Sequence, residues 1–162
     1  MSFDLGPLGY PADVTPGTSE LRLPAERRYI LVAKRAVAGF AAVAGLDVEA
    51  LDDLVIAVAQ ACENVISLTE RAAGPGCGHM RLIVTLADAA LQVEVRSSLT
   101  RAELEAAAAR RRAAAQAVLE ARAREAEEMA LKLMGLFVDD YGYRLDERTG
   151  GMRVRLTKYL VR

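Results

Sequence analysis

The segment from Leu54 to Ile66, which reads LVIAVAQACENVI, constrains the fold of this chain more than any other part of it. Apolar residues recur there at intervals of three and four, the spacing that gathers side chains on one face of a helix. The apolar stripe comprises Leu51, Leu54, Val55, Val58, Cys62, Val65 and Leu68, and a narrower stripe opposite it comprises Asp53, Ala57, Gln60, Asn64 and Ser67. One face of this helix is therefore expected to pack on a second layer.

Another helix is predicted directly before this one. Apolar residues recur at helical spacing after Pro24, which suits a first helical turn, and they are Tyr29, Ile30, Ala33, Val37, Phe40 and Ala44. Gly45 is a natural end for that helix, and Asp47 can cap the next one.

Five short segments alternate apolar and polar residues, the period of a β-strand. They span residues 18–23, 81–86, 91–96, 141–145 and 152–160. Segments 81–86 and 91–96 are close enough to form a hairpin with one buried and one wet face. The last two segments predict a second hairpin around the turn 147–151.

Residues 101–137 predict a long Ala-rich helix, continuous or broken once, because Ala, Arg and Glu dominate and no Gly or Pro occurs before Gly135. Its apolar stripe is confined to the second half and comprises Val118, Leu119, Met129, Ala130, Leu133, Leu136 and Phe137. The first half has only Leu104 as an anchor, so we expect it to project from the core or to lie on it weakly. The cluster Arg110-Arg111-Arg112 could bind an acidic partner or form a solvated helix face.

The resulting order β-α-α-β-β-α-β-β predicts an α+β fold. We expect a two-layer sandwich in which a mostly antiparallel sheet carries its helices on one face. Residues 18–162 would form a single domain. Residues 1–17 hold Gly6, Pro7, Pro11 and Pro16 without periodicity, which predicts a flexible N-terminal arm.

Composition narrows the classes of function. The net charge is −1, so no global basic field favours nucleic acid as a partner. No apolar run reaches the roughly 18 residues of a membrane helix. Cys62, Cys77 and the lone His79 cannot supply a four-ligand zinc site from this chain. We expect Cys62 to be a core residue and Cys77 a free thiol, which fits a cytoplasmic setting.

Four pieces of this sequence, in this order, resemble the anti-sigma factor serine kinase family, which has the histidine-kinase-like ATPase fold. They are Leu21-Arg22-Leu23-Pro24-Ala25, Gly45-Leu46-Asp47, the helix Leu54–Ile66 and the ending Val154–Leu160. The resemblance covers residues 18–96 and 129–160. It implies the same two-layer fold, with a Mg-ATP site on the helix that contains Asn64.

The resemblance also implies that this nucleotide site is degenerate. In the family a Glu precedes the magnesium-holding Asn by four residues, and here Gln60 takes its place before Asn64. A Gln amide has no basic site near neutral pH, so Gln60 is at most a vestige of the catalytic base. The adenine-reading Asp corresponds to Ser97, and the glycine-rich lid turn corresponds to the region near Glu128 and Ala130. The Ala-rich helix thus replaces the ATP lid.

Two functions follow from the resemblance. The first is a non-catalytic regulatory module that binds a sigma factor, an anti-sigma antagonist or a copy of itself, with no cofactor. The second is an active ATP-dependent serine/threonine-protein kinase, with Asn64 as the metal ligand and Gln60, Asn64 and Ser97 around Mg-ATP. A coiled-coil assembly through residues 101–128 is disfavoured because sustained heptads are lacking.

Overall fold

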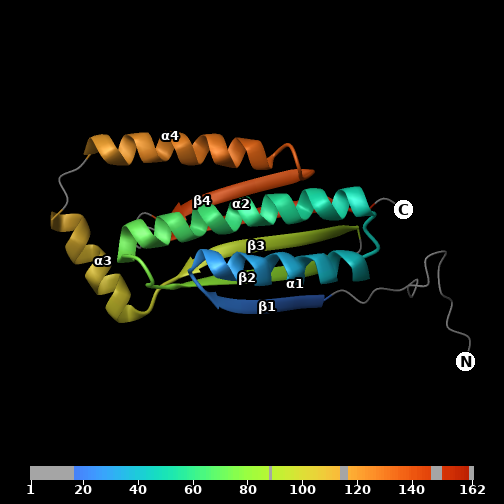
Figure 1. Cartoon of the computed structure of the whole chain (residues 1–162), viewed down its shortest axis with the longest axis horizontal. Coiled ribbons are helices and arrows are strands. Elements are labelled where there is room, and N and C mark those ends of the chain that lie inside the picture. The colour runs from blue at the N-terminus through green and yellow to red at the C-terminus, as the bar shows by residue number, and fades with distance from the viewer. Residues whose placement is uncertain (1–16, 88, 114–116, 147–150, 161–162) are drawn as a thin grey trace, which may run out of the picture.

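The computed structural model describes residues 17–87, 89–113, 117–146 and 151–160. Its elements are β1 (Gly17–Pro24), the 3-10 helix η1 (Arg27–Tyr29), α1 (Ile30–Val43), α2 (Val48–Ala73), β2 (His79–Ala87), β3 (Ala90–Ser98), α3 (Arg101–Ala113), α4 (Ala117–Met134), β4 (Asp140–Asp146) and β5 (Gly151–Tyr159). The described elements therefore follow the predicted order, with the Ala-rich segment represented by two helices (Figure 1).

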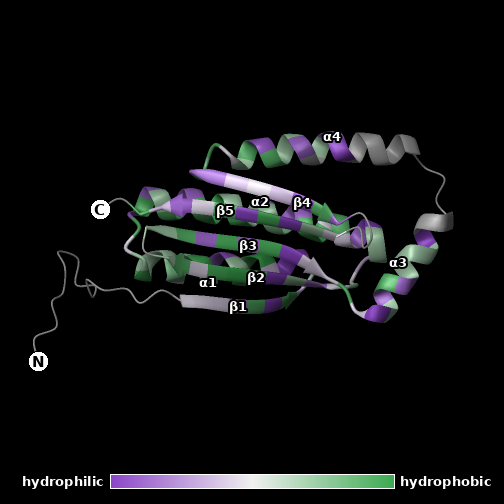
Figure 2. Cartoon of the chain, turned by 180° about the vertical axis from the view of Figure 1, so that it is seen from behind, coloured by the Kyte–Doolittle hydropathy of each residue, from purple (hydrophilic) through white to green (hydrophobic). Residues whose placement is uncertain are grey.

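The five strands form one antiparallel sheet in the order β1-β2-β3-β5-β4. Helices α1 and α2 lie across one face of it, and α4 lies beside α2 over the β4 edge (Figure 1). Seen from behind, the strands are not covered by helices (Figure 2). The predicted α+β architecture, with helices on a single face of the sheet, is confirmed.

The core lies between the helices and the sheet. Each strand of the central hairpin alternates its burial, as the sequence predicts: Leu82 and Val84 are buried while Arg81 and Thr85 are half-buried. The helices supply Ala33, Val37, Ala41, Leu54, Val58, Cys62 and Val65, and the sheet supplies Leu82, Val84, Leu91, Val93, Val95, Val154 and Leu156. Each fully buried Val or Leu side chain contributes about 1.5–3 kcal/mol.

Two helix boundaries form as the sequence predicts, and two predicted boundaries are wrong. The Oδ1 atom of Asp47 accepts a hydrogen bond of 2.8 Å from the backbone N–H of Ala50, which caps α2. Gly45 follows α1 with a φ of 79°. Pro24, however, ends β1 instead of opening a helix. Gly17, predicted as part of the arm, begins β1, and residues 1–16 lie outside the described residues.

The buried face of helix α4 differs from the apolar stripe that the sequence predicts. Leu131 and Met134, followed by Val138 after the helix, are the buried residues of this segment. Met129, Leu133 and Leu136, which were expected to be core, are 68%, 53% and 75% exposed. Two apolar stripes share this helix, and contact with α2 selects only one of them. The predicted residues Val118 and Leu119 lie outside the described side chains, and α4 ends at Met134, before the predicted Phe137.

Helix α3 is held against the end of α2 by a capping interaction. Thr100 and Glu103 form a capping box, since Glu103 Oε2 accepts from the Thr100 N–H at 2.7 Å and Thr100 Oγ1 accepts from the Glu103 N–H. Glu103 Oε1 also accepts from the Gly78 N–H at 2.7 Å, which joins α3 to the loop before β2. Ala107 is buried. The first half of the Ala-rich segment therefore lies on the fold.

Candidate functional site

Helix α2 brings Gln60 and Asn64 together, as their spacing of four predicts. Gln60 Nε2 donates a 3.1 Å hydrogen bond to Asn64 Oδ1. Asn64 is buried, with 6% of its surface exposed, and Gln60 is half-buried. The Nδ2 atom of Asn64 is buried and has no hydrogen-bond partner among the described residues. The two amides thus interact with each other, and one donor remains available.

Among the described residues, no carboxylate forms a hydrogen bond with this amide pair. Asp53, on the same stripe, lies 3.6 Å from Lys158 of β5. The Lys158 ammonium also donates to the backbone oxygen of Phe137 at 3.2 Å, so it connects α2, β5 and the turn after α4. The one carboxylate of the predicted stripe is therefore neutralised by a lysine.

The remaining acids of α2 near this level face the 3-10 helix. Arg27 forms ion pairs with Glu63 at 3.1 Å and Glu70 at 3.0 Å. Its hydrogen bond with Glu70, and then the charges of Glu70 and Glu63, raise the pKa of Arg27 above its ordinary value. Glu63 lies about 100° around the helix from Asn64, given 3.6 residues per turn. Glu63 therefore does not take over the role expected of an acid at position 60.

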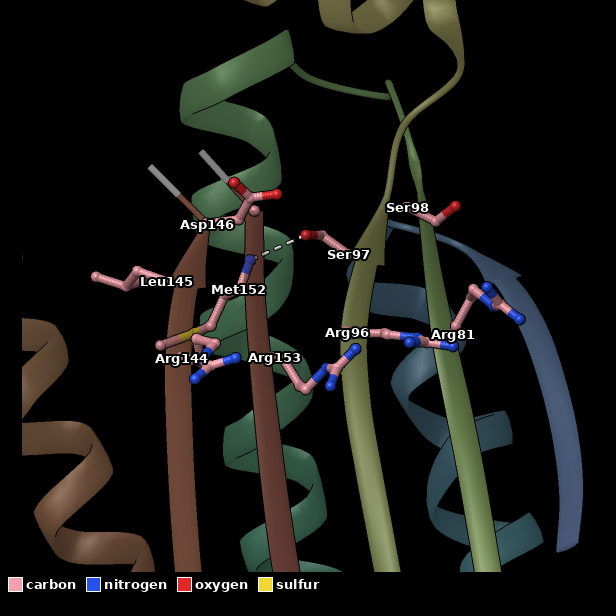
Figure 3. Close-up of a pocket in the computed structure, with 10 residues that line it drawn as sticks. Arg81, Arg96, Ser97, Ser98, Arg144, Leu145, Asp146, Met152 and Arg153 are labelled. Carbon is pink, nitrogen blue, oxygen red and sulfur yellow. Dashed lines mark hydrogen bonds between the residues drawn. The ribbon is translucent and has the colours of Figure 1, made fainter. Parts of the chain in front are cut away.

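Ser97 lies at the end of β3, where the sheet opens. The β3–β5 ladder ends at the pair Arg96 and Arg153. One residue further on, Ser97 Oγ accepts a 3.0 Å hydrogen bond from the backbone N–H of Met152 (Figure 3). Ser97 lines a hollow of about 700 Å³ whose lining does not include Gln60 or Asn64. Its hydroxyl is used to join two strands.

The region expected to cradle phosphates is a helix interior. Glu128 and Ala130 lie within α4, and Glu128 is exposed. Inside an α-helix each backbone N–H bonds to the carbonyl four residues earlier, so it is not free to bind a phosphate. The side chain of Glu127 lies outside the described residues.

These residues do not fit Mg-ATP. Magnesium requires oxygen ligands in near-octahedral geometry and is usually held through carboxylates together with substrate phosphates. Here the candidate ligand oxygen, Asn64 Oδ1, already accepts from Gln60. Within the described ranges, no group of three or more His, Cys, Asp or Glu could hold a metal ion.

The cysteines offer no nucleophile at this site. Burial raises the pKa of the Cys62 thiol to about 12, so it stays protonated at neutral pH. Both cysteines are free, as expected. His79 is half-buried, and its Nδ1 lies 3.5 Å from Nη2 of Arg22.

The structure also reveals a charged feature that sequence reasoning missed. The registers of the four strand pairs place one arginine of every strand in a single row across the open face: Arg22, Arg81, Arg96, Arg153 and Arg144. Four of them line the hollow beside Ser97 (Figure 3). The alternation of the strands predicts the face of each arginine. Only the pairing register shows that they align.

Comparison with known proteins gives one result that bears on this fold. No curated protein matches the chain in sequence. Among the described helices, none is long and apolar enough to cross a membrane. The model of the histidine kinase-like ATPase domain matches residues 23–158, which include every described helix, strands β2, β3 and β4, the end of β1 and nearly all of β5. The chain belongs to the histidine kinase-like ATPase domain family.

Proposed function

We propose that this protein is a regulatory protein-binding module of the anti-sigma factor type, without kinase activity. It would act in the cytoplasm through protein–protein contacts that control bacterial transcription. The observation that carries the proposal is the hydrogen bond from Gln60 to Asn64, in which two neutral amides occupy the position where nucleotide chemistry needs a base and a metal ligand. The fold is retained, whereas the chemical groups for phosphotransfer are not.

The energetic argument concerns three separate losses. Gln60 supplies no base, Ser97 supplies no carboxylate to an adenine, and α4 supplies no free backbone N–H groups near Glu128. Each charged hydrogen bond that is lost weakens binding by roughly 1.5–3 kcal/mol. Since each 1.4 kcal/mol is about tenfold in affinity, the losses together lower ATP affinity by several orders of magnitude.

A surface suited to a protein partner lies on α4. Met129, Leu133 and the following Leu136 are spaced by four and three residues and are all exposed. On the neighbouring edge strand β4, Tyr143 and Leu145 are also exposed. Exposed apolar groups of this kind mark protein contact sites more often than isolated ones do. The resemblance suggests a sigma factor or an anti-sigma antagonist as the partner.

The alternative function is an active ATP-dependent serine/threonine-protein kinase. One observation favours it: the buried Nδ2 atom of Asn64 has no partner among the described residues, so an acceptor from a ligand could satisfy it. Phosphotransfer would then require Mg-ATP between Asn64 and Ser97, and a base other than Gln60.

Calorimetric titration with ATP and Mg²⁺ separates the two functions. We expect no affinity in the micromolar range that depends on magnesium. The matched variant is Asn64→Ala, which removes the candidate metal ligand. A micromolar, magnesium-dependent affinity that this variant abolishes would overturn the proposal. In that case Gln60→Glu becomes the next variant, and a gain of phosphotransfer to a protein would establish the kinase.

The partner class is tested with the full chain as bait in an extract of its own host, followed by mass spectrometry. We expect enrichment of a sigma factor or an anti-sigma antagonist, and loss of that protein with Leu133→Lys as bait. Val43→Lys is the matched control, because Val43 ends α1 and has the same 53% exposure as Leu133. Retention of the partner by Leu133→Lys, or enrichment of neither class, would contradict this assignment.

A further inference from the structure

The open face of the sheet carries an unusual line of like charges. Five arginines, one from each strand, are directly paired across adjacent strands: Arg22, Arg81, Arg96, Arg153 and Arg144. Figure 3 shows the last four of them. Neighbouring strands in a sheet are separated by about 4.8 Å. Like charges placed directly opposite one another destabilise a sheet. The whole chain has a net charge of −1, so this concentration of positive charge is local.

Carboxylates neutralise only part of the row. Glu20 engages Arg81 through two hydrogen bonds of 2.7 and 2.6 Å. Glu94 is shared, since it lies 3.6 Å from Arg96 and 3.3 Å from Arg153. Among the described residues, Arg144 forms no ion pair. One carboxylate thus serves two guanidinium groups near the β3–β5 boundary, and a third guanidinium lies beside them.

Four of the five arginines line a hollow. The β3–β5 ladder ends at Arg96 and Arg153, and a hollow of about 700 Å³ opens at this end of the sheet. It is lined by Arg81, Arg96, Arg144, Arg153, Ser97, Ser98, Asp146, Leu145, Met152 and Gly151. Its four arginines outnumber Asp146 and the two carboxylates that pair with them, Glu20 and Glu94, so a net positive charge remains. The volume is within the range of about 300–1,000 Å³ typical of small-molecule sites.

One atom of this site lacks an acceptor. The Nε atom of Arg96 is buried and has no hydrogen-bond partner among the described residues. A buried donor without an acceptor costs free energy, so native structures rarely leave one unsatisfied. Arg96 is also the member of the row at the centre of the sheet, between Arg81 and Arg153. A bound anion would bring the negative charge that the partly exposed Arg96 guanidinium group lacks.

We infer that this hollow binds a small ligand that carries at least two linked phosphate groups, without a metal ion. The guanidinium group presents two parallel N–H donors that match phosphate oxygens, and adjacent arginines on paired strands can bind neighbouring phosphates. An acidic peptide is less suited to this hollow, because each carboxylate offers one charge and two oxygens. The site lies on the face opposite α2, because Arg81 and Arg96 alternate with the buried residues Leu82 and Val95. Its lining does not include Gln60 or Asn64. The inference therefore does not depend on the proposed function.

Pyrophosphate is the probe for this site. The full chain is titrated calorimetrically with sodium pyrophosphate and with inorganic phosphate, without divalent cations, against sodium chloride at equal ionic strength. We expect pyrophosphate to bind more tightly than phosphate, and chloride to give no signal. Arg96→Gln and Arg153→Gln should each weaken pyrophosphate binding about tenfold or more, because each removes a charge-assisted hydrogen-bonding group.

The matched control is Arg155→Gln. Arg155 is exposed on the same face and opposite Glu94, but it does not line the hollow. We expect Arg155→Gln to change pyrophosphate affinity less than threefold. An equal loss in this variant would show diffuse charge attraction and overturn the site. Arg144→Gln, on the exposed edge strand, provides a further variant if a central one fails to fold, and it should also weaken binding.

Two other results would overturn the inference. The first is a pyrophosphate signal no larger than that of chloride. The second is tighter binding of a poly-glutamate peptide than of pyrophosphate, with loss in Arg96→Gln, which would assign the row to an acidic protein segment. ATP without magnesium should bind through its phosphates, and this binding should survive Asn64→Ala. That result separates the arginine site from a nucleotide site on α2.

Discussion

The polar stripe of α2 and the arginine row of the open face lie on opposite sides of the same sheet. They differ in how far their polar side chains are paired with complementary partners. On the polar stripe of α2, neutral amides bond to each other and the one acid of the stripe, Asp53, is paired with Lys158. On the open face, like charges adjoin one another and Glu94 is shared by two arginines. On the helix side, where the family fold suggests chemistry, these polar groups bond to one another. On the open side, Arg144 forms no ion pair among the described residues.

The largest expected difference between the two faces comes from two adjacent residues of β5. Leu156 is fully buried and Arg155 is exposed. Leu156→Ala should lower the free energy of unfolding by about 2–5 kcal/mol, because it removes buried methyl groups and leaves a cavity. Arg155→Gln should change it by less than about 0.5 kcal/mol. Equilibrium denaturation measures both. Similar losses of unfolding free energy in the two variants would contradict the assignment of Leu156 to the core face and Arg155 to the open face.

The second prediction asks whether the amide pair is structural. Gln60→Ala should destabilise the protein by about 1–3 kcal/mol, since it leaves buried Asn64 without its hydrogen-bond donor. Replacement of both residues, as in Gln60→Leu with Asn64→Leu, should cost clearly less than the single change. Urea denaturation of the unmodified protein, Gln60→Ala and the double variant measures the three free energies of unfolding. A double variant less stable than Gln60→Ala would show that the amides have partners besides each other.

The third prediction concerns the capping box that anchors α3. Backbone hydrogen bonds from Thr100 and then Gly78 lower the pKa of Glu103 below its usual 4.5. The stabilisation is therefore fully present above about pH 4.5 and is lost as the pH falls through the lower folded-state pKa. Glu103→Gln should cost about 1 kcal/mol at neutral pH, because the amide has no charge and only one acceptor oxygen for the N–H groups of Thr100 and Gly78.

Amide exchange of α3 at decreasing pH provides the measurement. In the natural protein, protection of α3 should fall below pH 4.5, and in Glu103→Gln it should be low already at neutral pH. Helix α2, which Asp47 caps, serves as the internal reference. Equal protection of α3 in both proteins at neutral pH would show that Ala107 and its neighbours hold this helix without the cap.

The smallest expected effect has the opposite sign. Arg144→Gln should raise the unfolding temperature slightly, by the equivalent of a few tenths of a kcal/mol, because it removes one charge from a row of like charges. Arg81→Gln should lower it, since Arg81 forms two hydrogen bonds with Glu20. Thermal unfolding of both variants, without added phosphate, measures the two shifts. A lower unfolding temperature in Arg144→Gln would mean that a negative group already neutralises the charge of Arg144.

Local periodicity was sufficient to predict most of the fold. Alternation predicted the strands because residues two apart share a face, and the spacing of four predicted the contact between Gln60 and Asn64. Both are properties of a single element. The Asp47 cap was predictable for the same reason, since it involves residues three apart.

The features that could not be predicted depend on contacts between distant segments. On α4, Leu131 and Leu133 are both apolar and two residues apart, so they lie on different faces and only packing decides that Leu131 is buried. The arginine row depends on the register of four strand pairs, and a shift by one residue would move an arginine to the other face. Single-sequence periodicity contains no information about such a shift.

The strand order has a consequence for how the chain is made. Strand β5 follows β4 in sequence but lies between β3 and β4 in the sheet. During synthesis from the N-terminus, β4 therefore emerges before the only strand with which it pairs, and β3 has an open edge until β5 arrives. Pairing of β5 with both neighbours completes the sheet, and Lys158 of β5 also forms the ion pair with Asp53 of α2. Until residues 151–159 are available, the nascent chain exposes unpaired strand edges, the form of a protein most prone to aggregate.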